Sequence, residues 1–323
     1  MPFANPNNNK KRRILSLRQM MYWIGLALGG GLLLSQLIES IRALARKSIS
    51  GFQFDSLALA FLLMILIYAI QMLIWRESMA GIGVSLPVRS ILRKFWLSYL
   101  GRYIPGTVWG YLGRNEWLYK EFGVSYGYSN SGSLFETGFV LLGGLVIFAC
   151  GELWRGPWQI QALLVIMIVP ILSWFIIRQA SRWKIPENVS RLVPSFVIQY
   201  SLENMTLLRW FCTLVFSMTN WFLFGVCINL CLESLSIPLD FTFQSTLFIS
   251  SPIYAIAWMI GFFVLIVPGG LGVREVALTG LLAAFYAIPI DVSSIIAILM
   301  RLLGILAEFI WIFIGLISNR SRA

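Results

Sequence analysis

The chain has 323 residues, of which 58% are hydrophobic and only 12% are charged. A soluble domain carries about 25% charged residues, so this composition excludes a soluble protein and predicts a membrane protein. The net charge is +11 and histidine is absent, which excludes histidine-based acid–base catalysis and histidine metal sites. The cations flank apolar stretches, so we expect anionic lipid headgroups as partners and no nucleic acid. The expected fold is all-α, a polytopic helical membrane bundle.

Three regions follow from the distribution of charge along the chain. Residues 1–19 are polar and basic, which predicts a disordered cytoplasmic tail. Residues 20–317 form the transmembrane domain, and residues 318–323 form a short cytoplasmic tail. The first apolar run, about 20–38, is longer than the core of a signal peptide and further spans follow it. We therefore expect an uncleaved anchor.

Eight apolar runs are candidate membrane spans, the seventh being short for a full crossing. They lie at about 20–38, 57–75, 129–150, 159–177, 210–232, 246–267, 272–286 and 293–317. Cations gather in loops 76–94 and 178–209, whereas loops 233–245 and 287–292 have none. The positive-inside rule then places both termini in the cytoplasm, with the protein in the plasma membrane. Loop 39–56, which carries three cations, opposes this topology.

A first break interrupts the apolar run 95–113. It contains Arg102, Pro105 and Gly106, and Arg114 follows it. Proline removes a backbone donor and clashes with the preceding turn, so a regular helix cannot continue through it. Eight spans with both termini in the cytoplasm are possible only if this segment is a re-entrant loop that starts and finishes on the cytoplasmic side.

The stretch that follows the first break has two parts. Residues 112–128 are amphipathic and predict a segment at the membrane interface. The third span then carries a polar seam on one helix face. Its members are Ser129, Gly132, Ser133, Glu136, Val140 and Gly143. A lone Glu136 on this seam suits either pairing with an arginine or contact with a substrate.

A second break separates the sixth and seventh spans. It reads Pro268-Gly269-Gly270-Leu271-Gly272-Val273-Arg274-Glu275. In hydrocarbon, a broken backbone must be buried in protein or line a wet cavity, and a charge there indicates a functional site. The alternative is an ordinary cytoplasmic turn whose charges lie in water. One such break in each half of the chain suggests an inverted repeat with a binding site at its interface.

The last span carries two opposite charges on one helix face. Arg301 and Glu308 are seven residues apart, with Gly304 between them. Charges inside a membrane span should face the bundle and pair there, so we expect Arg301 to pair with Glu136 or Glu275. The four cysteines lie in or beside apolar runs, and the expected role for them is packing.

The two breaks also carry a family resemblance. The first contributes Arg102-Tyr103-Ile104-Pro105-Gly106 with Trp109 and Arg114, and the second contributes residues 268–275. Together they resemble the lysylphosphatidylglycerol synthase transmembrane-region family, also called the flippase-like domain family. In its best-understood members the membrane domain is associated with moving modified lipid between leaflets and is joined to an aminoacyl transferase domain. The chain ends shortly after its last span, so we expect neither that domain nor its activity.

The function predicted from these features is translocation of an anionic phospholipid or a polyprenyl-linked lipid. The alternative is a non-transporting accessory protein that works with a separate lipid synthase or glycosyltransferase. We expect no catalytic activity and no cofactor, because no nucleophile lies beside a recognisable base and no metal-ligand cluster is present. The candidate headgroup-binding residues are Arg102, Pro105, Gly106, Arg114, Glu136, Pro268, Gly269, Gly270, Gly272, Arg274, Glu275, Arg301 and Glu308. The expected mechanism brings the two breaks together in one anion-accepting cavity.

Overall fold

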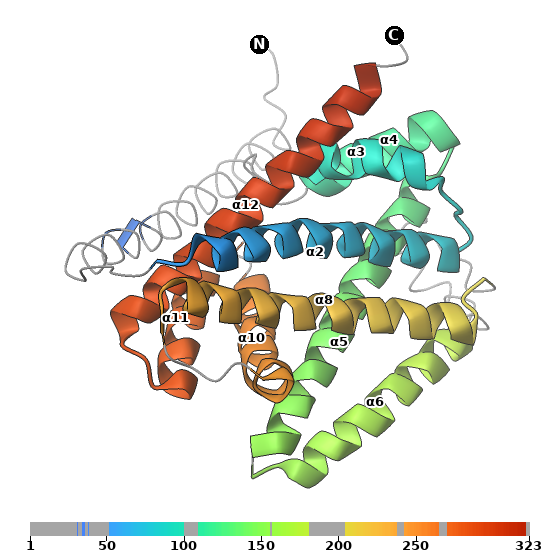
Figure 1. Ribbon diagram of the computed structural model, residues 1–323. Coiled ribbons are helices and arrows are strands. Elements are labelled where there is room, and N and C mark those ends of the chain that lie inside the picture. The colour runs from blue at the N-terminus through green and yellow to red at the C-terminus, as the bar shows by residue number, and fades with distance from the viewer. Residues whose placement is uncertain are drawn as a thin grey trace, which may run out of the picture.

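A computed structural model describes residues 31, 34–35, 38, 52–99, 109–155, 157–180, 204–237, 242–264 and 270–320. The regular elements of these ranges are helices (Figure 1). They are α2 (Phe54–Gly81), α3 (Val88–Tyr99), α4 (Trp109–Phe122), α5 (Tyr126–Arg155), α6 (Gln159–Ala180), α8 (Leu207–Ser234), α9 (Phe243–Ser245), the π-helix η2 (Thr246–Ser250), α10 (Ser251–Phe263), α11 (Val273–Tyr286) and α12 (Ile290–Arg320). The predicted all-α class is confirmed for this part of the chain.

Six helical stretches in the described ranges are long and apolar enough to cross a membrane. They coincide with six of the eight predicted spans, so the protein is a multi-pass helical membrane protein. The predicted span 20–38 lies largely outside the described residues. The predicted span 272–286 is α11, which has only 14 residues. The count of eight and the inverted repeat therefore stay predictions.

An antiparallel pair, α2 and α8, forms the centre of the bundle (Figure 1). At one end the amide of Gln53 donates to the carbonyl of Ser234 at 3.0 Å. Between the ends, Ala60, Cys227 and Cys231 are completely buried, and the Cys227 thiol donates to the Ala60 carbonyl. The two cysteines therefore act as packing residues in the core.

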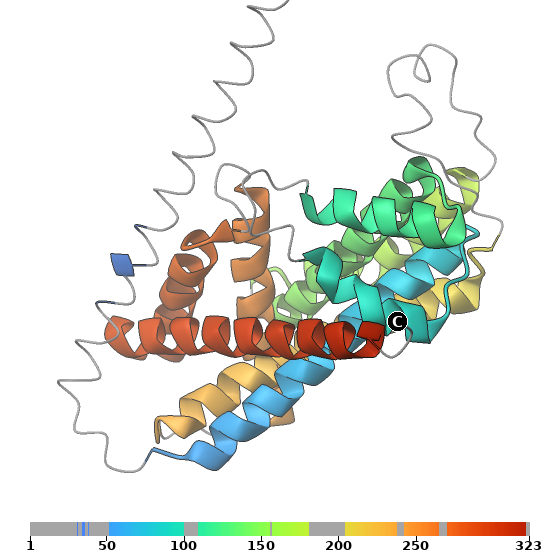
Figure 2. The same cartoon turned by 90° about the horizontal axis from the view of Figure 1, so that it is seen from above.

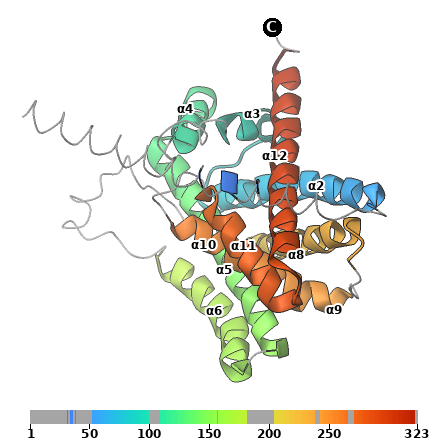
Figure 3. The same cartoon turned by 90° about the vertical axis from the view of Figure 1, so that its left-hand side faces the viewer.

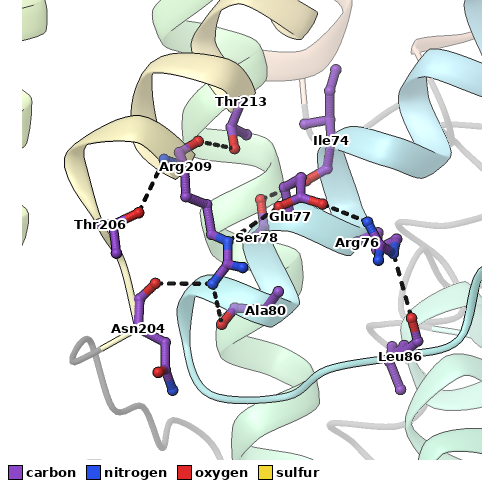
Figure 4. Close-up of polar contacts among 10 residues, drawn as sticks. All are labelled: Ile74, Arg76, Glu77, Ser78, Ala80, Leu86, Asn204, Thr206, Arg209 and Thr213. Carbon is purple, nitrogen blue, oxygen red and sulfur yellow. Dashed lines mark hydrogen bonds and ion pairs between the residues drawn. The ribbon is translucent and has the colours of Figure 1, made fainter.

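The other end of this pair is held by three charged side chains (Figure 4). Glu77 on α2 accepts from its neighbour Arg76 at 2.6 Å and from Arg209 on α8 at 3.1 Å. Arg209 also donates to the carbonyl of Ala80 near the end of α2, which accepts from the Gly83 amide as well. This cluster joins the end of α2 to the start of α8.

The predicted seam on the third span is buried in α5. Ser129, Ser133, Glu136 and Val140 are each at most 5% exposed. Glycine is required at Gly143, because a Cβ there would come within 2.3 Å of the Ser217 hydroxyl on α8. By contrast, α6 packs on α5 and turns most of its apolar side chains outward, where membrane lipid can solvate them.

Two amphipathic helices, α3 and α4, lie together at one end of the bundle (Figures 1 and 3). The predicted interfacial stretch 112–128 is thus the body of α4, a short connection and the first residues of α5. α3 brings Phe95 and Trp96 into an aromatic cluster with Trp75 of α2. This cluster fixes the two short helices to the bundle.

The long helix α12 crosses the bundle and contacts α2, α3, α8 and α11 (Figures 2 and 3). Its Trp311 indole donates to the carbonyl of Ile65 on α2 at 3.0 Å. The stretch from α9 through η2 to α10 forms one element that ends at Phe263, before the second break. The π-helix lies just before Pro252, which is in the first turn of α10.

Candidate functional site

The second break leads into a helix whose first turn is capped by its own glutamate. Gly272 has φ +79°, a conformation that glycine adopts without strain, and α11 begins at the next residue. The Glu275 carboxylate reaches back and accepts from the Gly272 amide at 2.7 Å through Oε2. This contact fixes the carboxylate beside the first turn, where the helix dipole favours a negative charge.

The other oxygen of Glu275 lies between two arginines. Its Oε1 is 3.7 Å from Nε of Arg274 and 3.6 Å from Nη1 of Arg301, which comes from α12. Both distances are ion-pair separations and exceed hydrogen-bond length. Glu275 is 1% exposed, whereas the two arginine side chains are 17% and 14% exposed. The cluster therefore has a buried anionic centre and a cationic rim.

Close packing of α10 holds this cluster in place. A Cβ at Gly270, which has φ +65°, would come within 2.8 Å of the Gly261 carbonyl oxygen on α10. The Arg274 guanidinium lies 5.6 Å from the centre of the Tyr254 ring, also on α10. Gly270 and Gly261 thus allow the backbone of the second break to pack directly against α10.

A second buried ion pair joins α4 and α5. Arg114 Nη1 is 2.9 Å from Glu136 Oε2, and both side chains are at most 5% exposed. The Gln71 amide of α2 donates to the other carboxylate oxygen at 3.3 Å, and Ser133 accepts from Arg114. Hydrogen bonds to both carboxylate oxygens compensate the cost of taking the charge out of water.

Aromatic rings complete the surroundings of Arg114. Its guanidinium carbon lies 4.8 Å from the centre of the Trp75 ring and 4.4 Å from that of Phe95. These are cation–π distances, and the rings bring α2 and α3 into the same site. Arg114 of α4 is therefore held by a carboxylate and two rings from three other helices.

The remaining predicted site residues fall into two groups. Glu308 is 3% exposed and lies on α12 with Arg301. Arg102, Pro105, Gly106, Pro268 and Gly269 lie outside the described residues. The structure thus brings Gly270, Gly272, Arg274, Glu275 and Arg301 together, and it joins Arg114 to Glu136 in a separate pair. Of the two candidate partners for Arg301, Glu275 lies 3.6 Å from its Nη1 atom.

Sequence reasoning missed a polar cluster at the opposite end of α11. The Asn229 amide of α8 donates to the Thr246 hydroxyl at 2.7 Å, and its oxygen accepts from Ser250 at 2.5 Å. The hydroxyl of Tyr286, the last residue of α11, contacts Ser250 and lies 3.3 Å from the same Asn229 oxygen. An asparagine within an apolar helix was the available signal.

Comparisons with known proteins assign no relative. No protein-family model matches the chain, and a search of the curated proteins finds no similar sequence. The resemblance carried by the two breaks therefore stays a prediction.

Proposed function

We propose that the protein is a flippase-like translocator that binds the anionic headgroup of a phospholipid or a polyprenyl-linked lipid. The observation that carries this proposal is the cluster at the start of α11, where Arg274 and Arg301 share the buried Glu275. Two partly exposed guanidinium groups beside one buried carboxylate suit a negatively charged phosphate.

The local chemistry suits a phosphate in three ways. A helix start presents amide groups and a positive dipole end, both of which favour anions. A guanidinium group can hold a phosphate with two parallel hydrogen bonds. The two arginines keep 17% and 14% of their side-chain surface exposed, so they can be reached from outside the protein interior. Membership of the flippase-like domain family is part of this proposal and is supported by the sequence of the two breaks.

The second pair favours a different candidate function. Arg114 and Glu136 are almost completely buried and pair directly at 2.9 Å, as expected of charges that only hold helices together. If the cluster at α11 were also purely structural, the protein would act as a non-transporting partner of a lipid synthase or glycosyltransferase. The exposed rim of Arg274 and Arg301 favours binding over this alternative.

A charge-preserving substitution tests the proposal. Lysine keeps the positive charge but lacks the planar fork of arginine. In proteoliposomes that report lipid movement between leaflets, Arg274→Lys and Arg301→Lys are each expected to slow movement of an anionic lipid about tenfold or more. Arg209→Lys, at the junction of α2 and α8, is the matched control and should move lipid at the wild-type rate. Wild-type rates for both site variants would rule out bidentate headgroup binding at this cluster.

A further inference from the structure

We propose that the polar cluster of Asn229, Thr246, Ser250 and Tyr286 is a binding site for a monovalent cation, sodium in particular. The cluster includes the last residue of α11, whereas Glu275 lies in the first turn of that helix. The proposal does not depend on lipid transport.

The first argument is the donor set. The four residues place an amide oxygen and three hydroxyl oxygens together, from α8, η2 and α11. Asn229, Thr246 and Ser250 are each at most 6% exposed. All four groups are neutral, whereas calcium sites use carboxylate ligands, so the set suits a singly charged ion. Polar groups inside membrane spans often mark ion paths.

The second argument is the local electrostatic field. Tyr286 is the last residue of α11, so the negative end of that helix lies at the cluster, and Asn229 lies five residues before the negative end of α8. Neither helix has a basic residue in its last turn, and α8 has Glu233 there. The opposing positive end, at the start of α9, is capped by the Thr242–Ser245 box. A bound cation would compensate the two negative ends.

The third argument is the backbone. Thr246 and Ser250 are the first and last residues of a π-helix, a form that is frequently found at functional sites. The wider turn brings Thr246 and Ser250 to the same Asn229 side chain, which contacts each of them with a different atom. Gly225 on α8 is required for this approach, because a Cβ there would come within 2.2 Å of the Ser251 hydroxyl. Packing of α8 against the π-helix thus assembles the site.

The oxygens of the cluster are hydrogen-bonded to one another and must move apart to admit an ion. The Asn229 amide oxygen lies 2.5 Å from the Ser250 hydroxyl and 3.3 Å from that of Tyr286, and the two hydroxyls contact each other. Hydroxyl hydrogens rotate freely to suit a new partner. Sodium therefore needs a smaller rearrangement than potassium. The same contacts would also serve a hydrogen-bonded network that only joins helices, and the experiment separates the two roles.

Thermal unfolding of the purified protein in detergent tests the site. Sodium chloride replaces choline chloride at constant ionic strength, and a ligand that binds the folded state raises the Tm in a saturable way. We expect a saturating rise with sodium and a smaller one with potassium. Equal Tm values in sodium, potassium and choline would overturn the proposal, and a larger rise with potassium would overturn the assignment to sodium.

Variants locate the effect. Tyr286→Phe keeps the ring and removes one oxygen, so it should lose the sodium response. Tyr68→Phe, which removes a hydroxyl from α2 outside the cluster, should keep it. Ser250→Ala provides a second test if Tyr286→Phe does not fold, and binding of radioactive sodium to the wild-type protein needs no variant. A full sodium response in both cluster variants, or no bound sodium in the wild type, would contradict the proposal.

Discussion

The hydroxyl of Tyr68 on α2 lies against Gly304 on α12, where a Cβ would come within 3.0 Å of it. Gly304 is one helical turn from both Arg301 and Glu308, and Tyr68 is one turn from Gln71, which contacts Glu136. The Tyr68–Gly304 contact, where α2 crosses α12, therefore lies between the cluster at Glu275 and the Arg114–Glu136 pair. A change in this crossing would act on both charged groups.

The Tyr68–Gly304 contact predicts coupled substitutions. Gly304→Ala should gain about 1 kcal/mol of helix propensity, but in the wild-type protein the new methyl group meets the Tyr68 hydroxyl. In a Tyr68→Phe background the hydroxyl is gone. We expect Gly304→Ala to be more favourable there by roughly 0.5–1 kcal/mol. A double-mutant cycle on chemical unfolding in detergent measures this energy. Additive effects would show that α12 can shift away from Tyr68 without a loss of stability.

Removal of Arg301 should destabilise the protein through Glu275. Breaking a buried ion pair leaves an uncompensated charge and typically costs 3–5 kcal/mol. We expect Arg301→Ala to approach the lower end of about 3 kcal/mol, because Arg274 still lies 3.7 Å from the same carboxylate oxygen. Glu275→Gln removes the buried charge and should restore part of the loss. Unfolding of the single and double variants measures both effects, and no rescue by Glu275→Gln would contradict the pairing.

The two ion-paired networks that contact α2 should differ in strength. Arg114→Ala leaves Glu136 buried and also removes the contacts with Trp75 and Phe95, so we expect a loss of about 3–5 kcal/mol. Arg209→Ala removes a side chain that is 31% exposed, and its loss should be about 1 kcal/mol or less. Both values come from the same unfolding assay. Equal losses would mean that burial does not set the strength of these pairs.

The charge distribution of the loops predicts their sides of the membrane. Gln244 is exposed in α9, next to the cation-free loop, and Ser85 is exposed in the cation-rich loop after α2. In intact cells, a membrane-impermeant thiol reagent should label Gln244→Cys and leave Ser85→Cys unlabelled. The wild-type chain, with its four native cysteines, gives the background. Labelling of Ser85→Cys without labelling of Gln244→Cys would show that the predicted topology is inverted.

Much of the architecture was accessible from local sequence patterns. Apolar runs of about 20 residues predict spans, because a bilayer requires that length of helix. The same local logic placed a helix start after Gly272 and put Glu136 on a buried seam of α5. Sequence patterns also limited the expected partners of Arg301 to two acidic residues, Glu136 and Glu275. The residues of the first break and part of the second lie outside the described ranges, so their convergence stays a prediction.

Local sequence patterns predict the class of protein, the approximate spans and the charges that face the bundle, because each of these depends on one helix at a time. The contact of Arg301 with Glu275 and that of Glu136 with Arg114 depend on how the helices pack. Helix packing also assembles Asn229, Thr246, Ser250 and Tyr286 from three separate elements. The physical reason is that partner choice depends on how helices cross, and close contacts at Gly143, Gly225 and Gly304 set those crossings through packing between distant segments.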